Sequence, residues 1–417
     1  MTMAAVESSS APPASPPRKS GPFTSLRNRD FRWLWISTVS AGFGQWGQQI
    51  ALNWLVYVMT GSAVQLGAVT FAGGLISLFL TPFAGLLADR YSRRTIMVVS
   101  MFAGAAQAAV IAVLVLTGLV QVWHAYLFAV LAALAQAANQ PARQAYVNDA
   151  STPETLANAI ALNSIAQNVS RIVGPPLAGI IAVWNVGAAF LFVAAIKGFA
   201  TLATMLLSDR PQARATTTRN PVLQIADGFA YLLREPRLRL LLLINAAPAL
   251  LIYPYMSFMP IFAEEVFDAD WAYGWLVAMI AVGSVVGLFA LAWVGDIRRK
   301  PQIMLACFMA YLVLVVAFTR VDLLAAGLAI LIVAGVFHGV ALALNNTVFQ
   351  TEVRADMRGR GLAAWQIGFG LMPLGGLPMG LMVDRFGIQD GVALEMLLCI
   401  VIFAGIVIFG RSLTRSE

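Results

Sequence analysis

The chain has 417 residues, of which 59% are hydrophobic and only 11% are charged, and its formal net charge is +7. Soluble domains carry about 25% charged residues, and a soluble fold of this length has more surface than so few polar side chains can cover. The composition therefore excludes an ordinary soluble protein. It predicts an all-α polytopic membrane protein, because helices satisfy their backbone groups internally in lipid.

The N-terminal residues lie outside the apolar pattern. Residues 1–22 are rich in Ser, Pro and Ala and lack both an apolar core and a cleavage site, so we expect a disordered cytosolic tail rather than a secretory signal. From residue 31 onward, apolar stretches long enough to cross about 30 Å of hydrocarbon recur. The predicted helices are 31–58, 63–88, 95–117, 122–141, 155–183, 186–208, 237–263, 271–294, 302–319, 323–347, 359–383 and 391–410.

Basic residues predict the orientation. Most of the 27 Lys and Arg residues fall in the tails and in the loops on the side of the N-terminus. The exceptions are Arg320 and Arg385 in opposite loops, and Arg171 and Lys197 inside predicted helices. Since basic residues are retained on the cytosolic side, we expect a multi-pass protein of the cell (inner) membrane with both termini cytoplasmic. The positive charge then attracts anionic lipid headgroups, and nucleic acid is not an expected partner because no soluble basic module exists.

A cluster of charged residues separates the second and third predicted helices, in the stretch GLLADRYSRRTIM (85–97). Asp89 at a helix end can pair with loop arginines and accept from the N-terminus of a neighbouring helix. Such a cytosolic clasp would hold one conformation and release in another. The alternative is that the arginines are ordinary positive-inside markers. The predicted gating residues here are Gly85, Asp89, Arg90, Arg93 and Arg94.

The longest polar break divides the chain into two similar parts. After the loop at 208–221, apolar residues recur at helical spacing, which indicates a helix lying in the cytosolic interface. LADRYSRRTIM (87–97) aligns with VGDIRRKPQIM (294–304) and matches Asp89 with Asp296, a further gating residue. Parallel repeats imply a pseudo-twofold axis and a substrate path between the halves. The expected domains are the tail 1–22, a six-helix bundle 23–208, a linker 209–236, a six-helix bundle 237–411 and a tail 412–417.

The stretch G-x-L-x-D-R-x-x-R-R between helices 2 and 3 resembles the signature of the major facilitator superfamily, and the weaker copy at Asp296 lies where that superfamily repeats it. The resemblance implies twelve transmembrane helices in two pseudo-symmetric six-helix bundles. A narrower resemblance is to its transmembrane secretion effector branch. It is carried by SLRNRDFRWLW (25–35), LNWLVYVMTGSAVQLG (52–67), PARQAYVNDAST (141–152), LANAIALNSIAQNVSRIVGPPLAG (156–179) and DGFAYLLREPRLRLLLL (227–243). This branch implies an exporter, typically driven by proton entry.

The fifth predicted helix contains SRIVGPPLAG, which resembles the G-P-x-x-x-G pattern of the superfamily's antiporters. Gly174 and Gly179 permit close approach of a neighbouring helix, whereas Pro175 and Pro176 free backbone carbonyls and bend the segment. A bent helix of this kind can seal a leak path. It can equally be a packing feature, and both interpretations stand.

Polar groups at membrane depth are costly and tend to face the interior of the bundle. Arg171 and Lys197 lie about halfway along their helices without an acidic residue at similar depth, which suggests a substrate with carboxylate, phosphate or catecholate groups. The alternatives are that carbonyls near Pro175 satisfy Arg171 and that Lys197 extends to an interface or faces lipid. The predicted substrate-binding residues are Gln45, Gln48, Gln49, Asn53, Asn139, Asn163, Gln167, Arg171, Lys197, Asn245, Tyr253, Asn345, Trp365 and Gln366.

Proton coupling requires a titratable group whose charge changes with the side of access. His338 and Glu395 are the candidates, because histidine titrates near neutrality and a buried carboxyl can be shifted toward it. The alternatives are that His338 is a packing residue, or that Asp89 or the substrate itself carries the proton. The sequence thus predicts protons, membrane lipids and a small molecule as partners of a monomer.

No catalytic, cofactor or metal-binding motif is recognisable, so we expect neither an enzyme nor a bound cofactor. Cys307 and Cys399 fall inside predicted helices and read as packing residues. Three functions remain open. The first is secondary active export of a bulky anionic or amphipathic compound, such as a siderophore or drug, by alternating access. The others are uptake or uniport of a small organic anion, and a non-transporting membrane sensor.

Overall fold

The computed structural model describes residues 23–209, 221–295, 297–354, 357, 361, 365, 368 and 370–409, with the side chains of 81–90, 221–226 and 406–409 outside the description. Across these ranges the chain forms helices and no strand. The first half contains η1 (Thr24–Arg27), α1 (Arg29–Thr60), α2 (Ala63–Arg90), α3 (Arg93–Leu116), α4 (Val122–Asp149), α5 (Leu156–Trp184) and α6 (Val186–Met205). Next come α7 (Pro221–Arg234), α8 (Pro236–Leu251), η2 (Tyr253–Phe258), α9 (Met259–Ile261), η3 (Phe262–Val266), η4 (Asp270–Ala272) and α10 (Tyr273–Val294). The last are α11 (Lys300–Phe318), α12 (Leu324–Glu352), η6 (Met372–Gly375), α14 (Gly376–Phe386) and α15 (Ile388–Phe409).

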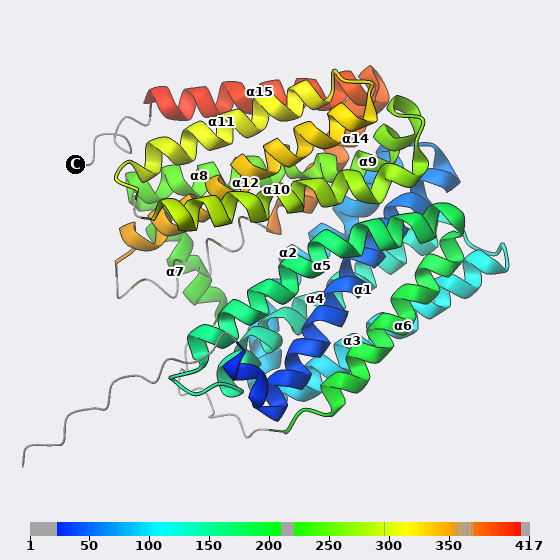
Figure 1. Ribbon diagram of the computed structural model, residues 1–417, viewed down its shortest axis with the longest axis vertical. Helices are drawn as coiled ribbons and strands as arrows, with labels where there is room; N and C mark the ends of the chain where they lie inside the picture. The colour runs from blue at the N-terminus through cyan, green and yellow to red at the C-terminus, as the bar shows by residue number, and fades with distance from the viewer. Residues whose placement is uncertain are drawn as a thin grey trace, which may run out of the picture.

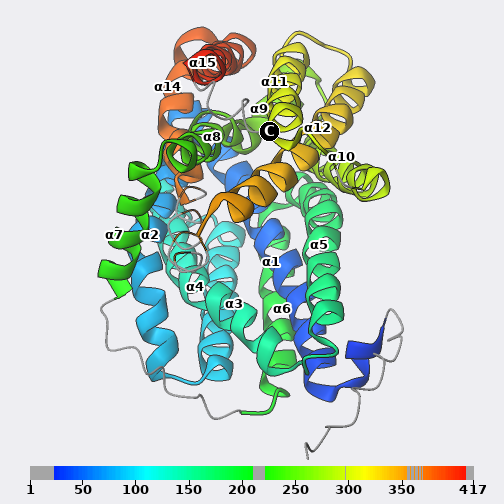
Figure 2. The ribbon, with the colours of Figure 1, turned by 90° about the vertical axis from the view of Figure 1, so that its left-hand side faces the viewer.

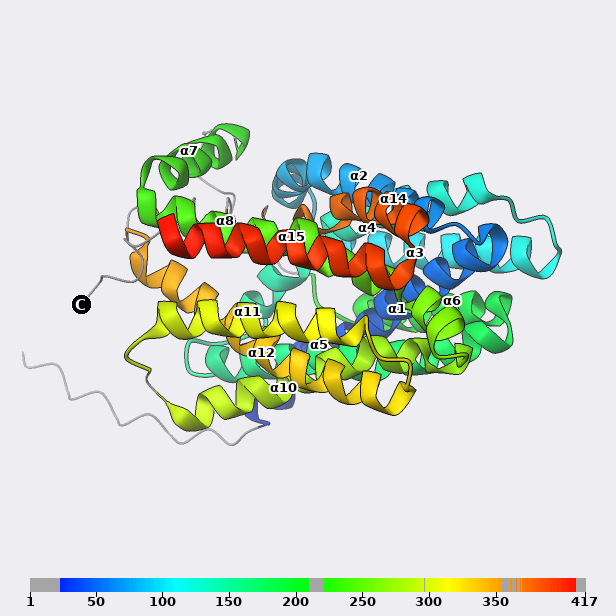
Figure 3. The ribbon, with the colours of Figure 1, turned by 90° about the horizontal axis from the view of Figure 1, so that it is seen from above.

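The helices form two bundles, α1–α6 and α8–α15, which we call the N-terminal and C-terminal halves (Figure 1). Helix α7 packs against α8 and α2 and lies at the left-hand edge of Figure 2. Viewed from above, α15 and α11 run alongside each other on the outside of the C-terminal half (Figure 3). The two halves meet toward one end and diverge toward the end that carries α7 and the C-terminus (Figure 1).

Local chemistry sets several helix ends. The Asn28 side chain accepts hydrogen bonds from the backbone N–H groups of Asp30 and Phe31 at the start of α1. Ser92 caps α3 in the same way, which satisfies N–H groups that have no partner within the helix. At the other end of α1, Gly61 takes a left-handed conformation with φ 57°, which a residue without Cβ adopts at no steric cost. These punctuation residues fix the short turn between α1 and α2.

Backbones of the two halves touch along a seam at the end opposite α7. A Cβ atom on Gly274 of α10 would lie 2.3 Å from the carbonyl oxygen of Pro175 in α5. A Cβ atom on Gly67 of α2 would lie 2.1 Å from the carbonyl oxygen of Gly376 in α14. Such distances exclude any side chain larger than hydrogen at these positions without movement of a helix. The seam (α5–α10 and α2–α14) therefore depends on glycine.

Nine helical segments within the described ranges are long and apolar enough to cross a membrane. Helices α1 and α5 do not reach that threshold, although they pack inside the N-terminal half. Polar residues lower their hydropathy, among them Gln45, Gln48 and Gln49 in α1 and Gln167 and Arg171 in α5. Helices that face a wet interior are expected to be less apolar than those that face lipid. The fold is that of a multi-pass membrane protein.

Several predicted boundaries need correction. Helix α12 continues to Glu352, five residues beyond the predicted 323–347, and the predicted helix 359–383 is interrupted by the 3₁₀ helix η6 before α14, which ends at Phe386. Helix α4 continues to Asp149, eight residues beyond the predicted 122–141, so Arg143 lies inside a helix and not in a cytosolic loop. The predicted helix 237–263 is broken, because α8 is followed by the 3₁₀ helix η2, the short α9 and the π-helical η3. Pro248 and Pro254 lie in this segment, and each lacks the backbone N–H that an unbroken helix would use as a hydrogen-bond donor.

Candidate functional site

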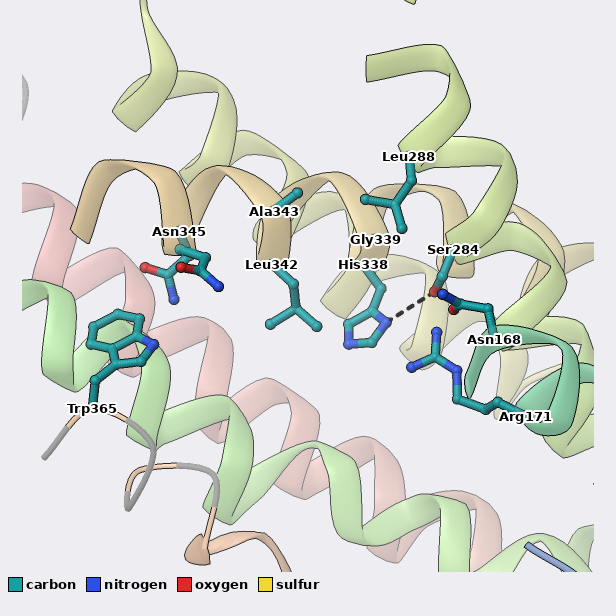
Figure 4. A pocket seen from close by; sticks show the side chains of 11 residues that line it. Asn168, Arg171, Ser284, Leu288, His338, Gly339, Leu342, Ala343, Asn345 and Trp365 are labelled. Carbon is teal, nitrogen blue, oxygen red and sulfur yellow. Dashed lines mark hydrogen bonds between the residues drawn. The ribbon is translucent and has the colours of Figure 1, made fainter. Parts of the chain in front are cut away.

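A cavity of about 280 Å³ lies between the halves, beyond the seam. Ser284 is ten residues along α10 from Gly274, which corresponds to about 15 Å of helix. Most of the cavity wall belongs to the C-terminal half, and two residues of α5 close it from the other side (Figure 4). The lining residues are Asn168, Arg171, Ser284, Leu288, His338, Gly339, Leu342, Ala343, Asn345, Asn346 and Trp365.

Arg171 is the charged residue of this lining. Its guanidinium extends from α5 toward Ser284 and His338 of the opposite half (Figure 4). No carboxylate of the described residues forms an ion pair with it, and its Nε is buried without a hydrogen-bond acceptor. Guanidinium donors match carboxylate and phosphate oxygens in geometry and charge. The cavity thus presents an uncompensated cation to whatever enters it.

His338 faces Arg171 from α12. Its Nδ1 lies 3.3 Å from the Ser284 hydroxyl, which also donates to the Ile280 carbonyl oxygen at 2.9 Å. A hydroxyl has one proton to donate, so with that proton on Ile280 the Ser284 oxygen accepts from the N–H of Nδ1. The neutral ring then carries an unprotonated Nε2, and this atom is buried without a partner. The rings of Tyr253 and Tyr311 lie 5.2 and 5.0 Å from the imidazole and fix its position.

An amide pair forms the part of the site on the side of α7. Asn345 is 1% exposed, and both polar atoms of its side chain lack hydrogen-bond partners. Asn245 of α8 donates to the carbonyl oxygen of Trp365 at 3.3 Å, while its own Oδ1 has no partner. Trp365 stacks on Phe349 with ring centroids 4.0 Å apart. Buried amides with unmade hydrogen bonds beside a cavity can bind a polar ligand.

The predicted amides of α1 are spread over different environments. Gln45 accepts a hydrogen bond from Gln136 of α4 at 2.9 Å, and Gln49 is partly exposed. Asn53 of α1 lies beside Tyr273 of α10, whose ring stacks with that of Trp54 with ring centroids 5.9 Å apart. Neither this set nor Asn139, Asn163 and Gln167 belongs to the lining of the cavity. Gln366 lies outside the described residues.

Lys197 is separate from the cavity. It lies between α6, α1 and α3 inside the N-terminal half, and its Nζ donates to the Oε1 of Gln48. Tyr253 does not line the cavity either, but its ring contacts that of His338, which does. Of the two cations predicted at membrane depth, the structure therefore places only Arg171 at the cavity between the halves.

Glu395 lies on α15, deep in the C-terminal half. Its side chain is 3% exposed, and Oε2 has no hydrogen-bond partner. Cys399 follows one helical turn later and is a free thiol, as is Cys307. Both proposed proton-coupling residues thus belong to the C-terminal half, although only His338 reaches the cavity.

The predicted gating residues divide into two groups. Gly179 and Pro175 lie in the seam, where a Cβ atom on Gly179 would be 2.8 Å from the Gly274 nitrogen, while Gly174 packs against Trp46. At the other end of the N-terminal half, the Arg93 Nη1 forms an ion pair with Asp149, and the Arg94 Nη2 donates to the carbonyl oxygen of Met205 at 2.6 Å. The side chains of Gly85, Asp89 and Arg90, and all of Asp296, lie outside the described residues.

Arg143 is a buried cation that the sequence interpretation assigned to a loop. It is 5% exposed and donates from Nη1 to the hydroxyls of Ser37 (3.2 Å) and Thr38 (3.0 Å), while Nε and Nη2 have no partner. A signal was present, because Ala142, Tyr146 and Val147 continue the apolar spacing of α4 on the same side.

Comparison with known proteins agrees with this architecture. The family model described as "Transmembrane secretion effector" matches residues 20–417. The chain is similar to the staphyloferrin A transporter of Staphylococcus aureus, with 26% identity, covering 86% of this chain and 90% of that protein. It is also similar to the multidrug efflux pump Tap of Mycobacterium tuberculosis H37Rv (28% identity, 85% and 87%) and to macrolide efflux protein A of Streptococcus pyogenes (23%, 85% and 90%).

Solved structures share the fold at lower identity. The nucleoside transporter NupG matches with a TM-score of 0.71 and 14% identity, covering 93% of this chain and 99% of that one. A bacterial homologue of the lysosomal transporter Spinster, in an inward-facing conformation, matches with a TM-score of 0.70 and 15% identity, covering 93% and 96%. The resemblance expected from the sequence is thereby confirmed: the chain belongs to the transmembrane secretion effector family and has the fold of major facilitator transporters.

Proposed function

We propose that this transporter exports a bulky anionic compound such as a siderophore, with carboxylate, phosphate or catecholate groups, by alternating access in exchange for protons. The observation that carries the proposal is Arg171, which lines the cavity between the halves and has no carboxylate partner in the part of the chain that the structure describes. An anion there would receive hydrogen bonds from the guanidinium and from amides such as Asn345. It would replace the compensation that a buried charge otherwise lacks.

The direction of transport is supported by relatives and by the membrane potential. A relative is named a multidrug efflux pump and another a macrolide efflux protein. With the cytosol negative, outward movement of an anion is favoured by about 2.3 kcal/mol per charge per 100 mV. The exchange of an anion for incoming protons adds to that driving force. His338 and Glu395 are the proton-carrying candidates in the C-terminal half.

The conformational cycle follows from the seam. If both termini are cytoplasmic, as the basic residues predict, the seam closes the outer side and the cavity opens toward the cytosol. Rocking of 23–208 against 237–411 would open the seam at Gly67 and Gly274 and close the cytosolic side. There Asp89, Arg93, Arg94 and Asp296 would form the cytosolic clasp. The cycle requires only one chain, so we propose a monomer of the inner membrane.

A binding screen of the purified protein tests the proposal. Thermal stability would be measured with staphyloferrin A, citrate and the macrolide erythromycin. We expect anions to raise the melting temperature of the parent and not that of Arg171→Ala, because the guanidinium contributes about 1.5–3 kcal/mol through charged hydrogen bonds. Arg320→Ala is the matched control. It removes the same charge from an ion pair with Asp390 that lies outside the cavity.

The screen also distinguishes the alternatives. Stabilisation by erythromycin alone, undiminished in Arg171→Ala, would favour an amphipathic drug held by Trp365 and Leu342 and would overturn the anionic substrate. Direction would be measured with inverted vesicles. In these vesicles export appears as uptake into the lumen, and it should increase when the lumen is more acidic than the medium. Accumulation only in right-side-out vesicles would identify an importer.

A further inference from the structure

A lysine is enclosed within the N-terminal half by two glycines of other helices. A Cβ atom on Gly44 of α1 would lie 2.6 Å from the Cγ of Lys197, and a Cβ atom on Gly104 of α3 would lie 3.2 Å from its Nζ. The side chain of Lys197 is 7% exposed. Because Gly44 and Gly104 have no side chains, the lysine side chain fits between α1 and α3. We call this space the lysine pocket (Gly44, Gln48, Gly104 and Lys197).

Gln48 provides the recorded hydrogen bond of the amine, through its amide oxygen. Charged residues on the helices packed against α6 are engaged or directed elsewhere. On α1, Asp30 bonds to Ser208, and Arg29 and Arg32 lie in the first turn. On α3, Arg93 and Arg94 lie about 15 Å from Gly104 along the helix and bond to Asp149 and Met205. On α5, Arg171 lines the cavity. Among the described residues, no carboxylate compensates the ammonium of Lys197.

Neither protonation state of the amine is fully satisfied in this environment. An ammonium has three N–H donors, of which the Gln48 oxygen satisfies one, and it loses hydration when it is buried. A neutral amine fits the apolar walls of the pocket but gains less from Gln48. A group whose charged and neutral forms are close in free energy can take up and release a proton when its surroundings change slightly.

One residue of the lysine pocket, Gln48, is partly exposed. Gln48 is half-buried and lies one turn from Gln45, which is exposed and accepts from Gln136 of α4. Lys197 and Gly104 are each the twelfth residue of their helix, so the amine lies near mid-depth in the bundle.

We propose that Lys197 is a proton-carrying residue of the transport cycle: its ε-amine accepts one proton on one side of the membrane and releases that proton on the other. The step is the reversible conversion of an amine to an ammonium, with no other bond formed or broken. The inference deepens the proposed proton exchange and rests on it. It assigns Lys197 a role distinct from binding the substrate, because the lysine pocket is separate from the cavity of Arg171.

Three substitutions distinguish a carrier from a structural lysine. Staphyloferrin A uptake into inverted vesicles would be compared with and without a pH gradient. We expect Lys197→Met, always neutral, and Lys197→Arg, always charged, each to lower gradient-driven uptake about tenfold while exchange at equal pH is retained. Lys197→His, which can still titrate, should restore uptake with a displaced pH profile. Lys19→Met, in the N-terminal tail, is the control.

The pattern of the variants decides the proposal. Full gradient-driven uptake by Lys197→Arg would mean that only the charge is needed, and full uptake by Lys197→Met would mean that only the volume is needed; either result overturns the proposal. Melting temperatures of the variants separate loss of coupling from misfolding. Glu395→Gln, which neutralises another candidate proton carrier, is measured in parallel for comparison.

A spectroscopic test needs no substrate and remains valid if the proposed anion does not bind. The chain has three lysines, Lys19, Lys197 and Lys300. With ¹³Cε-labelled lysine in the full-length protein, Lys197→Met identifies the Lys197 signal by its loss. We expect this signal to move between its ammonium and amine positions across the pH range in which the vesicles transport. A signal that stays at one position throughout that range would contradict the proposal.

Discussion

The two halves of this transporter hold opposite kinds of chemistry. The N-terminal half holds three cations, of which Arg143 and Lys197 are buried and Arg171 is partly exposed at the cavity. Among the described residues, hydroxyls accept from Arg143 and an amide oxygen accepts from Lys197. The C-terminal half buries an acid, an imidazole and several phenols, including Glu395, His338 and Tyr253. The cavity between them is therefore asymmetric: Asn168 and Arg171 line it from the N-terminal half, whereas Ser284, His338 and Asn345 are among the residues that line it from the C-terminal half.

The largest effect is expected where the halves touch. Gly274→Val would place a side chain against the Pro175 carbonyl, where even a Cβ atom is 2.3 Å away, so the seam cannot close. We expect export to fall about tenfold or more. Gly198→Val is the control, because a Cβ atom at Gly198 meets nothing within 4 Å. Uptake by inverted vesicles measures the effect, and a parent-like rate would mean that the halves do not close against each other here.

A smaller effect is expected at the wall of the C-terminal half. Ser284→Ala removes the oxygen that accepts from Nδ1 of His338 and frees the ring to change tautomer. The loss of one hydrogen bond is worth about 1 kcal/mol, so we expect roughly fivefold weaker anion binding. Binding of citrate or staphyloferrin A by calorimetry would measure it. Unchanged affinity in Ser284→Ala would show that the orientation of His338 does not matter to the anion.

A hydrogen bond that crosses between the halves should matter less. The Tyr57 hydroxyl of α1 donates to Oε1 of Glu265 in η3 at 3.3 Å, and Glu265 is exposed. Because water competes at such a site, Tyr57→Phe is expected to change the transport rate only about twofold, by favouring the open seam. Initial rates of uptake by inverted vesicles measure the change, and equal rates in Tyr57→Phe and the parent would dissociate this contact from conformational change.

The smallest effect on transport is expected at Arg143. Replacing a buried charge that lacks a carboxylate by an apolar residue of similar length is often neutral or stabilising, so Arg143→Met should retain export and melt no lower than the parent. Thr38→Val leaves one more guanidinium N–H unpaired and should cost about 1–3 kcal/mol. Thermal unfolding of both variants checks the contrast. Loss of export in a stable Arg143→Met would place all three cations of the N-terminal half in the cycle.

The sequence predicted the fold well because the length and hydropathy of membrane helices can be recognised in a sequence. Most boundaries fell within a few residues, and the exceptions were places where polar or Pro residues interrupt that signal, as in α4 around Arg143 and in the broken segment after Pro248. The cavity was harder to predict. Spacing placed Arg171 at mid-depth but could not say whether a side chain faces the partner half or its own bundle.

Lys197 illustrates that limit. It has the same charge and a similar depth to Arg171, yet its surroundings depend on Gly44 and Gly104, which are 60 residues apart in sequence and come together only through packing. Asn345 lines the cavity, whereas Asn53, predicted for the same role, lies outside the lining and beside Tyr273. Rotation about each helix axis, which no single sequence records, decides such cases. The roles of these residues stay predictions.

The mixed pitch of the segment from α8 to η3 has a mechanical consequence. Its ladder changes from α to 3₁₀ and then to π within Pro236–Val266, with Tyr253 and Tyr255 at the first change and Glu264 and Glu265 at the second. A rod with two such weak points twists in parts, since few hydrogen bonds must be exchanged at each. The two ends of this segment can therefore rotate relative to each other more easily than the ends of an unbroken α-helix of the same length.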